Sequence, residues 1–386
     1  MMKVIVITSL LIMNITATAQ TNKELERRLN ILAVEISQMK ETKTGFGNTR
    51  IGGYGEFTYT NIRHEDETGK TVANGTNPEA DAQRFILYIA HDFSPKWKLS
   101  SEIEIEHVNQ IFLEQATIDY IHSDAINFQV GLMLIPVGIV NLYHEPTSFL
   151  TVERPEIESK IIPSTWRENG ISFFGKNHKL NYRLSLVGGI LASGFSSDGV
   201  RGGRQKGAQA EARDLAWVGR LDYQIVSNAV LGASAYIGKA GGTNTDVSHK
   251  IYELHFDGTF AGFHTRVFYT ISSLGNTTQL NNELGKTGSA AVGKKMTGYY
   301  AELGYNVLRN ITDWSLLPFV RYEKYNTQDE VEATFTKDKS KDRTNTILGI
   351  NAKPIESIVF KFDYTMAKNK AKTGQDAWRL GFGWNF

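Results

Sequence analysis

Hydrophobic and polar residues alternate with a period of two from Arg50 to the end of the chain. The segment IVFKFDYT (358–365) places Ile, Phe, Phe and Tyr on one face and Val, Lys, Asp and Thr on the other. In WKLSSEIEIE (97–106), Trp, Leu, Ser and Ile alternate with Lys, Ser and Glu. Alternation of this kind predicts β-strands with one apolar and one hydrophilic face. About sixteen such segments lie between 50 and 386, which predicts an all-β fold.

The connections between these segments alternate between short turns and long loops. The short turns fall at 94–95, 123–124, 176–177, 227–228 and 353–354, and the long loops at 64–82, 135–166, 190–215, 274–295 and 326–341. Soluble β-sandwiches also have alternating strands, but they rarely segregate loop lengths in this way. An even number of antiparallel strands, with short turns at one rim and long loops at the other, is the layout of a transmembrane β-barrel. We therefore expect an antiparallel barrel over 50–386, with both ends of the barrel chain at the rim of short turns.

Residues 1–19 have the features of a secretory signal peptide. Lys3 precedes an apolar run (4–13), and Ala17-Thr18-Ala19 gives the small-x-small pattern of a cleavage site. The apolar run is too short to cross a bilayer as a helix, and no later stretch approaches the roughly 20 apolar residues that a spanning helix needs. We expect this segment to be removed on export, and any membrane span to consist of strands.

A short amphipathic helix is predicted over 20–43. Its apolar residues recur at alternating spacings of four and three, as in the a/d seam of a coiled coil: Leu25, Leu29, Leu32, Ile36 and Met39. A single helix packed against its own domain gives the same pattern. We favour self-association, because so polar a helix has only a narrow apolar stripe to bury. A linker (44–49) then leads to the first strand, which in a bacterial outer-membrane barrel places the helix in the periplasm.

Composition excludes several partners and sites. The chain has 42 Lys and Arg against 41 Asp and Glu, and this near neutrality argues against nucleic acid as a partner. There is no Cys, so neither a disulfide framework nor a thiolate metal site can form. The nine His are scattered singly; His255 and His264 can approach across a hairpin, but we interpret them as lining the lumen. We expect no metal and no cofactor.

Enzyme-like motifs are present only as short matches. Ser37 to Lys40 fits S-x-x-K, and 286–288 and 372–374 fit K-T-G, a set found in penicillin-recognising enzymes. The first match falls on the predicted helix and the others in loops, so we interpret them as chance matches. We can assign no nucleophile with a base and an orienting acid, and we predict no catalytic residue and no enzymatic activity.

Aromatic residues gather near the ends of the predicted strands, where amphipathic rings suit the two headgroup regions of a bilayer. The last strand places alternate residues on one apolar face and ends in an aromatic: Trp378, Leu380, Phe382, Trp384 and Phe386. A terminal aromatic of this kind resembles the signal that the barrel-assembly machinery reads. We therefore expect outer-membrane lipid and this machinery as partners.

Three stretches resemble the phosphate-selective porin O/P family of Bacteroidetes-type outer-membrane porins. They are 129–175, where IPVG, HEP, ERP and IIPSTWRENG follow in that order, LPFVRYEKYNTQ (317–328) and the closing strand. With the strand pattern, the resemblance covers about residues 50 to 386. It implies a sixteen-stranded homotrimeric barrel in the Gram-negative outer membrane, with the loop after the fifth strand folded inward as a constriction. It does not identify the solute, because members of the family differ in selectivity.

Candidate pore-lining residues follow from the inserted loop and from the strand alternation. Four Pro restrict the backbone of 135–166, which favours a fixed insert over a floppy loop; the alternative is an external loop packed on a neighbouring subunit. The charged residues of this loop and of the inward strand faces are His144, Glu145, Glu153, Arg154, Glu156, Glu158, Lys160, Arg167, Arg183, Arg220, Arg266, Arg321, Glu323, Lys361, Arg379, Glu102, Glu104, Glu106 and Asp119. We hypothesise a transverse field, basic on the later strands and acidic on the early ones. The alternative is that these residues only solvate a polar lumen.

Taken together, these patterns predict a porin for passive diffusion of small hydrophilic solutes, with phosphate-like anions as the candidates that the resemblance implies. A barrel of about sixteen strands is wide enough for an aqueous channel. A non-conducting surface adhesin, whose long loops bind a partner, is the main alternative. Bilayer conductance separates the two, because only the porin gives steady stepwise openings.

Overall fold

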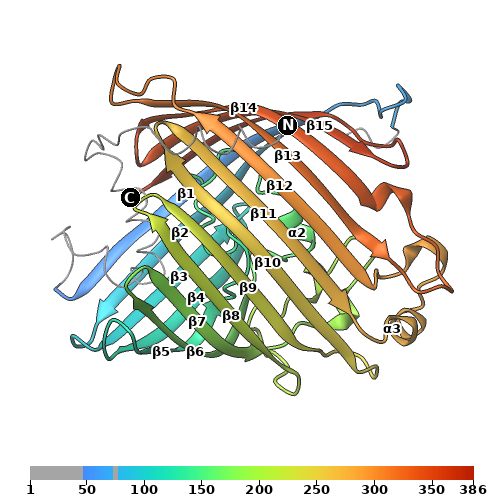
Figure 1. Ribbon diagram of the computed structural model, residues 1–386, viewed down its shortest axis with the longest axis horizontal. Helices are drawn as coiled ribbons and strands as arrows, with labels where there is room; N and C mark the ends of the chain where they lie inside the picture. Colours follow the sequence, from blue (N-terminus) through green and yellow to red (C-terminus); the bar gives the residue numbers. More distant parts are fainter. Residues whose placement is uncertain (1–46, 73–76) are drawn as a thin grey trace, which may run out of the picture.

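The computed structural model describes residues 47–72 and 77–386, which form one closed antiparallel β-barrel (Figure 1). This confirms the predicted all-β barrel and its strand number. Two short helices lie in the connections, α2 (Ile157–Lys160) and α3 (Thr277–Glu283). The strands are β1 (Thr49–Ile62), β2 (Glu79–Asp92), β3 (Trp97–Glu106), β4 (Gln110–Ile121), β5 (Asn127–Leu134), β6 (Arg167–Asn177), β7 (Leu180–Gly188), β8 (Leu215–Val226), β9 (Ala229–Ala240), β10 (Val247–Phe260), β11 (Phe263–Leu274), β12 (Lys295–Tyr305), β13 (Ser315–Glu330), β14 (Asp342–Ile355), β15 (Ile358–Asn369) and β16 (Ala377–Asn385).

The predicted signal peptide and coiled-coil helix, with its five heptad residues, lie outside the described residues. Among the residues that the structure does describe, no helix is long and apolar enough to cross a membrane.

Every strand pairs with its neighbours in sequence, and β1 pairs with β16 to close the ring. The closure is completed by the last residue: Gly53 N donates to Phe386 O (3.0 Å), and Phe386 N donates to Gly53 O (2.9 Å). A closed ring satisfies the backbone groups that an open sheet would leave exposed at its edges. The aromatic C-terminus is therefore part of the seam.

The outer surface of the barrel is apolar. In β11, Val267 and Tyr269 are each 44% exposed, whereas the alternate residues Arg266 and Phe268 are at most 1% exposed. The same alternation runs through the neighbouring strands. Outward-facing residues include Phe57, Ile103, Leu113, Val130, Ile171, Leu184, Trp217, Leu221, Leu231, Ile237, Leu254, Leu303, Tyr322, Leu348, Phe360 and Leu380. A belt of this extent would be unfavourable in water, far beyond the patches found on soluble monomers.

Loop lengths are segregated as expected, but some turns are displaced. The longest connections, 63–78, 135–166, 189–214 and 275–294, all follow odd-numbered strands. The predicted turn at 176–177 is wrong, because these residues end β6 and the turn falls at His178, whose φ of +51° suits a tight hairpin. The predicted turn at 353–354 is also wrong, since both residues lie within β14 and the chain reverses at Glu356 and Ser357.

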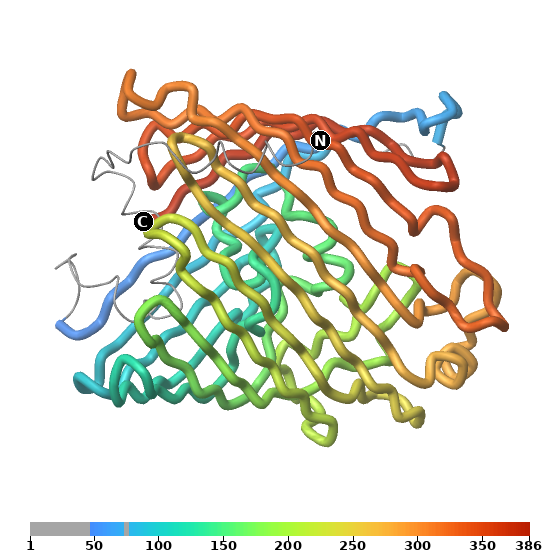
Figure 2. Tube along the Cα trace, viewed as in Figure 1, coloured from blue at the N-terminus to red at the C-terminus, as the bar shows by residue number. Residues whose placement is uncertain are grey.

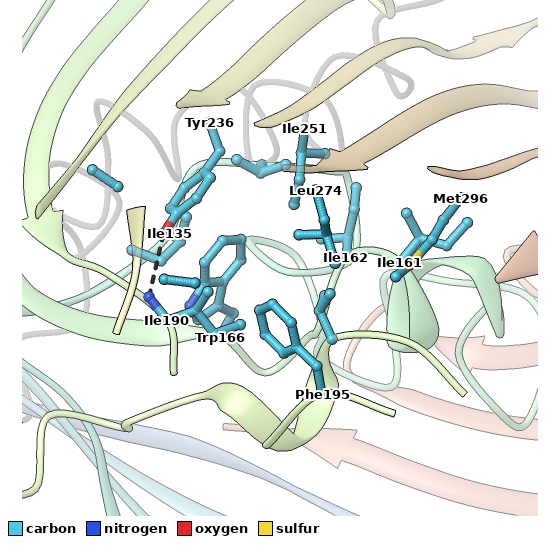
Figure 3. Packing of buried hydrophobic residues seen from close by; sticks show 14 of the residues in the cluster. Ile135, Ile161, Ile162, Trp166, Ile190, Phe195, Tyr236, Ile251, Leu274 and Met296 are labelled. Atoms are coloured by element: carbon cyan, nitrogen blue, oxygen red, sulfur yellow. Dashed lines mark hydrogen bonds between the residues drawn. The ribbon is translucent and has the colours of Figure 1, made fainter. Parts of the chain in front are cut away.

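The main hydrophobic core lies inside the barrel. Loops 135–166 and 189–214 enter the ring (Figure 2). Their apolar side chains pack against inward side chains of β8 to β13. Figure 3 shows Trp166 of the first loop between Tyr236 of β9 and Phe195 of the second loop, with Ile161 of the first loop beside Met296 of β12. The hydroxyl of Tyr236 accepts a hydrogen bond from Ile190 N at 3.3 Å. Part of the inner face of β8 to β13 is therefore apolar, under the two inserted loops.

Candidate functional site

The loop 135–166 is closed at its neck by Asn141. Its side-chain amide donates to Ile135 O (2.7 Å) and Trp166 O (3.0 Å), and its carbonyl accepts from Trp166 N at 2.6 Å. Ile135 N also donates directly to Trp166 O. The neck is fully buried. Asn141 and Trp166, which lies in the stretch IIPSTWRENG, thereby hold together the two ends of the loop where it leaves β5 and enters β6.

Beyond its neck, the loop runs along the inner wall formed by β8 to β15. Side chains of these strands bond to its backbone or to its carboxylates, so the strands fix its path across the lumen. The contacts are Arg220 Nη1 to Gly138 O (2.5 Å), Arg266 Nη2 to Ser148 O (3.2 Å), Asn351 Nδ2 to Leu150 O (3.1 Å), Lys361 Nζ to Thr151 O (2.9 Å), Val152 N to Asp363 Oδ2 (2.7 Å), Ile157 N to Glu323 Oε1 (2.6 Å) and Tyr300 OH to Glu158 Oε1 (2.7 Å).

Glu158 on α2 ties two parts of the loop to the wall. One carboxylate oxygen accepts from Ile139 N and Val140 N, each at 2.7 Å, and the other accepts from the Tyr300 hydroxyl. Burial raises the pKa of the Glu158 carboxyl, and these hydrogen bonds oppose the rise. The side chain is fully buried, so it holds the fold of the loop and does not contact solvent.

The predicted basic residues of the later strands face inward but are covered by the loop. Arg321, 0% exposed, donates from Nε to Glu302 Oε2 at 2.8 Å. Arg266 pairs with Asp257 (2.7 Å), and Arg220 with Asp222 (2.7 Å). Each of these charges is neutralised beside the wall. The basic side of the predicted transverse field therefore does not lie on β8 to β13.

The second inserted loop, 189–214, lies on the first. Val200 N donates to Lys160 O (3.3 Å), and Arg204 Nη1 donates to Ser164 O (3.2 Å) and Thr165 O (2.8 Å). This contact brings Arg201, Arg204 and Lys206 close to Arg154 of the first loop and to Arg167 at the start of β6.

These five residues form a cluster that we call the basic loops: Arg154, Arg167, Arg201, Arg204 and Lys206. Burial, together with the neighbouring Arg204 and Arg154, lowers the pKa of Arg201. Burial and repulsion from Arg204 and Arg167 likewise lower the pKa of Lys206. Burial is the largest cause of both lowered pKa values, and repulsion between neighbouring cations adds to it, which indicates that these positive charges lie close together.

Carboxylates gather beside the basic loops, on β1, β3 and β4. We call this set the acidic wall: Glu56, Glu102, Glu104, Glu106 and Glu114. Glu106 attracts Arg201 and Arg204, and Glu56 and Glu114 attract Arg154. Arg84 of β2 lies within the wall, 3.3 Å from Glu56 and 3.6 Å from Glu104. The basic loops and the acidic wall therefore face each other.

The other predicted residues lie apart from these two surfaces or support them. Arg183 donates to Gln129 (2.6 Å) and attracts Asp119, and Arg379 lies 3.5 Å from Asp363. Glu156 contacts Tyr325 and Arg343. His144 lies 3.4 Å from Glu114. Glu145, Glu153 and Lys160 are loop residues, of which Lys160 bonds to the second loop through its carbonyl.

Sequence reasoning missed Arg84, Glu114 and the basic residues of the second loop. The stretch RGGRQK (201–206) carries a signal, because three cations within six residues are unusual in a loop that also contains apolar residues. Glu114 was missed because strict alternation from Asp119 places it outward, and a carboxylate on the lipid face is the signal of a register shift. In the structure a β-bulge opposite Glu102 and Ile103 shifts the phase of β4, so Glu114 turns inward and is 0% exposed.

Comparison with known proteins places the chain among outer-membrane barrels by fold. A protein of Aquifex aeolicus (strain VF5), described as uncharacterized, is 32% identical over 376 residues, which are 92% of this chain and 83% of that protein. No family model matches the chain. Similar solved structures include Salmonella typhi OmpF in complex with daunomycin (TM-score 0.60, 11% identity, covering 88% of this chain and 97% of that chain). They also include the anion-selective porin from Comamonas acidovorans (0.54, 11%, 88% and 99%) and the trimer form of Vibrio cholerae OmpT (0.56, 10%, 88% and 99%).

Proposed function

Because the chain belongs to the same family as the Aquifex aeolicus protein and shares its fold with outer-membrane porins, we propose that it is a porin of the bacterial outer membrane. Small hydrophilic solutes diffuse through it between the basic loops and the acidic wall. The observation that carries the proposal is the opposition of these two charged surfaces inside a closed barrel with an apolar belt. We also propose, on the motifs of 129–175, kinship with the phosphate-selective porin O/P family and assembly as a homotrimer.

The clustered cations favour anionic solutes over cationic ones. Arg201, Arg204 and Lys206 of the loop 189–214 have no carboxylate within 4 Å among the described residues. Arg84 of the acidic wall, by contrast, lies close to both Glu56 and Glu104. A phosphate-like anion can accept hydrogen bonds from several guanidinium groups at once. We therefore propose selective passage of small anions along the basic loops.

Planar bilayers test this proposal directly. We expect the refolded protein to open in steps of uniform conductance, with a reversal potential in a salt gradient that indicates anion preference. The pair of changes Arg201→Glu and Lys206→Glu is expected to shift the anion-to-cation permeability ratio at least about three-fold toward cations, because it removes most of the net positive charge of the basic loops. Arg63→Glu, which changes an exposed ion pair on the β1–β2 loop, is the control. Absence of stepwise openings, or an unchanged ratio in the double variant, contradicts the proposal.

The membrane location has its own test at Leu221, which is 54% exposed near the middle of β8. We expect Leu221→Arg to lower the free energy of unfolding in lipid vesicles by about 2–4 kcal/mol, because it places a charge against the lipid. Leu221→Ala is the control for lost apolar contact. Equal urea midpoints for the Arg and Ala variants would show that this face does not contact lipid.

A further inference from the structure

The bulge residue Glu114 is the starting point, because it is a buried carboxylate without hydrogen bonds. Its side chain is 0% exposed, and neither oxygen has a hydrogen-bond partner among the described residues. The basic side chain within 4.0 Å of it in the described chain is that of His144, whose Nε2 lies 3.4 Å from Oε1. A buried carboxylate with an unbonded oxygen is costly, so such a group calls for a further partner.

In its neutral form, His144 presents a lone pair to this carboxylate. Its Nδ1 lies 3.3 Å from the backbone oxygen of Asn141, and a carbonyl oxygen can only accept, so Nδ1 carries a hydrogen. In the neutral ring, Nε2 is then an acceptor directed at the acceptor Oε1 of Glu114. A hydrogen bond from Nδ1 to a backbone carbonyl is also the usual way in which a metal-binding histidine is held in its tautomer.

Glu102 of β3 completes the group. One oxygen of Glu102, one oxygen of Glu114 and one ring nitrogen of His144 all lie within 4.8 Å of one another. Two carboxylates and a neutral imidazole bring a charge of −2, which a divalent cation balances. Glu102 is partly exposed, so the group has a route to solvent.

The neighbouring arginines are engaged elsewhere. Arg84 contacts Glu56 and Glu104, Arg154 donates to His144 O (3.4 Å), and Arg167 donates to Leu113 O at 3.0 Å. None of them lies within ion-pair distance of Glu114 in the described part of the chain, although Arg167 and Arg154 attract it from further away. Their engagement leaves the space between the three ligand groups to a small cation.

We propose that Glu102, Glu114 and His144 bind a divalent transition-metal ion such as Zn²⁺. A mixed nitrogen and oxygen set suits Zn²⁺, whereas Mg²⁺ and Ca²⁺ prefer oxygen ligands alone. The ion links the loop 135–166 to β3 and β4, on the side of the lumen opposite its hydrogen bonds with β8 to β15. It therefore fastens the loop to the acidic wall. The proposal does not depend on solute passage.

Calorimetry with Zn²⁺ on the detergent-refolded full chain tests the site. We expect one ion bound per chain, with Glu114→Gln and His144→Gln each weakening the affinity at least about ten-fold. His264→Gln is the matched control: this buried inward histidine also lies 3.4 Å from a carboxylate, that of Glu302, but Arg321 already pairs with Glu302. Its Zn²⁺ affinity should equal that of the unchanged protein. Mg²⁺ should not compete at equal concentration.

The proposal is overturned if the unchanged protein does not bind Zn²⁺, or if Glu114→Gln and His144→Gln bind it as tightly as the unchanged protein. His144 is then a protonated ion-pair partner of Glu114. X-ray absorption at the zinc edge of the unchanged protein gives a readout that needs no variant. We expect nitrogen and oxygen neighbours with the outer-shell features of one imidazole, and a spectrum without imidazole features contradicts the site. Bilayer conductance is measured separately, so loss of the metal proposal leaves the porin proposal standing, and the converse also holds.

Discussion

Replacing Glu158 with Ala is expected to release the middle of the loop 135–166 from the barrel wall. The change removes the acceptor of two backbone N–H groups and of the Tyr300 hydroxyl, and it leaves all three donors buried. Losing several hydrogen bonds to a charged group should destabilise the bound loop by roughly 3 kcal/mol or more. We expect rapid tryptic cleavage after Lys160 in folded protein, and noisy current in place of steady steps.

The matched control for this prediction is Tyr300→Phe. It removes one of the three hydrogen bonds at Glu158 and keeps the ring, so it should cost only about 1 kcal/mol and leave the loop resistant to trypsin. If Glu158→Ala were as resistant as Tyr300→Phe, the apolar contacts of the loop would be sufficient to hold it, and the carboxylate would not be its main attachment.

Arg321→Met should strongly destabilise the barrel. The guanidinium is 0% exposed, donates to Glu302 and lies over the ring of Tyr300, with its Cζ 5.3 Å from the ring centre. Removing it leaves Glu302 buried without its cation, a loss that typically costs about 3–5 kcal/mol. The midpoint of urea unfolding in lipid vesicles measures the effect.

The double change Arg321→Met with Glu302→Leu distinguishes the loss of the ion pair from the loss of packing around the Arg321 side chain. Replacing both charges with apolar groups of similar size removes the uncompensated carboxylate, so most of the stability should return. A double variant no more stable than Arg321→Met alone would show that packing around the Arg side chain, and not its charge, is what the barrel needs.

Strand number and closure could be predicted because the belt facing outward is apolar nearly everywhere. Turn positions depend on more than residue type, since Lys176 and Asn177 are typical turn residues and yet continue β6. Here the residue with positive φ, His178, decides where the chain reverses. Helix α3 was not predicted either, because Thr277 to Glu283 carries too few apolar residues to give a helical period.

The inner surface was harder to predict than the outer one. Inward residues such as Val218, Tyr236 and Phe268 are apolar, which departs from the expectation that the inner face is hydrophilic. The signal is a run with both faces apolar, as in VFYTI (267–271), which marks a strand covered on the outside and by a loop on the inside. Charge alone could not show that Arg220 and Arg266 lie under that loop, because their contacts depend on where it runs.

Glu114 shows where the period-two alternation of a strand fails to predict the direction of a side chain. One additional residue in β4 reverses the direction of every side chain beyond it, so Leu113 faces outward at 48% exposure and Glu114 faces inward. The signal for the bulge in QIFLEQATIDYI (110–121) is Glu114 itself, since a strand without the bulge would turn this carboxylate toward lipid.

The path of the loop 135–166 also has a consequence for the order of folding. Its backbone bonds to residues far later in the chain, with Val152 and Asp363 separated by 211 positions. These attachments cannot form until β15 is in place, so the insert settles only when the ring is almost complete. Contacts so distant in sequence are slow to form. During biogenesis the strands must therefore assemble around an interior whose final partner arrives last.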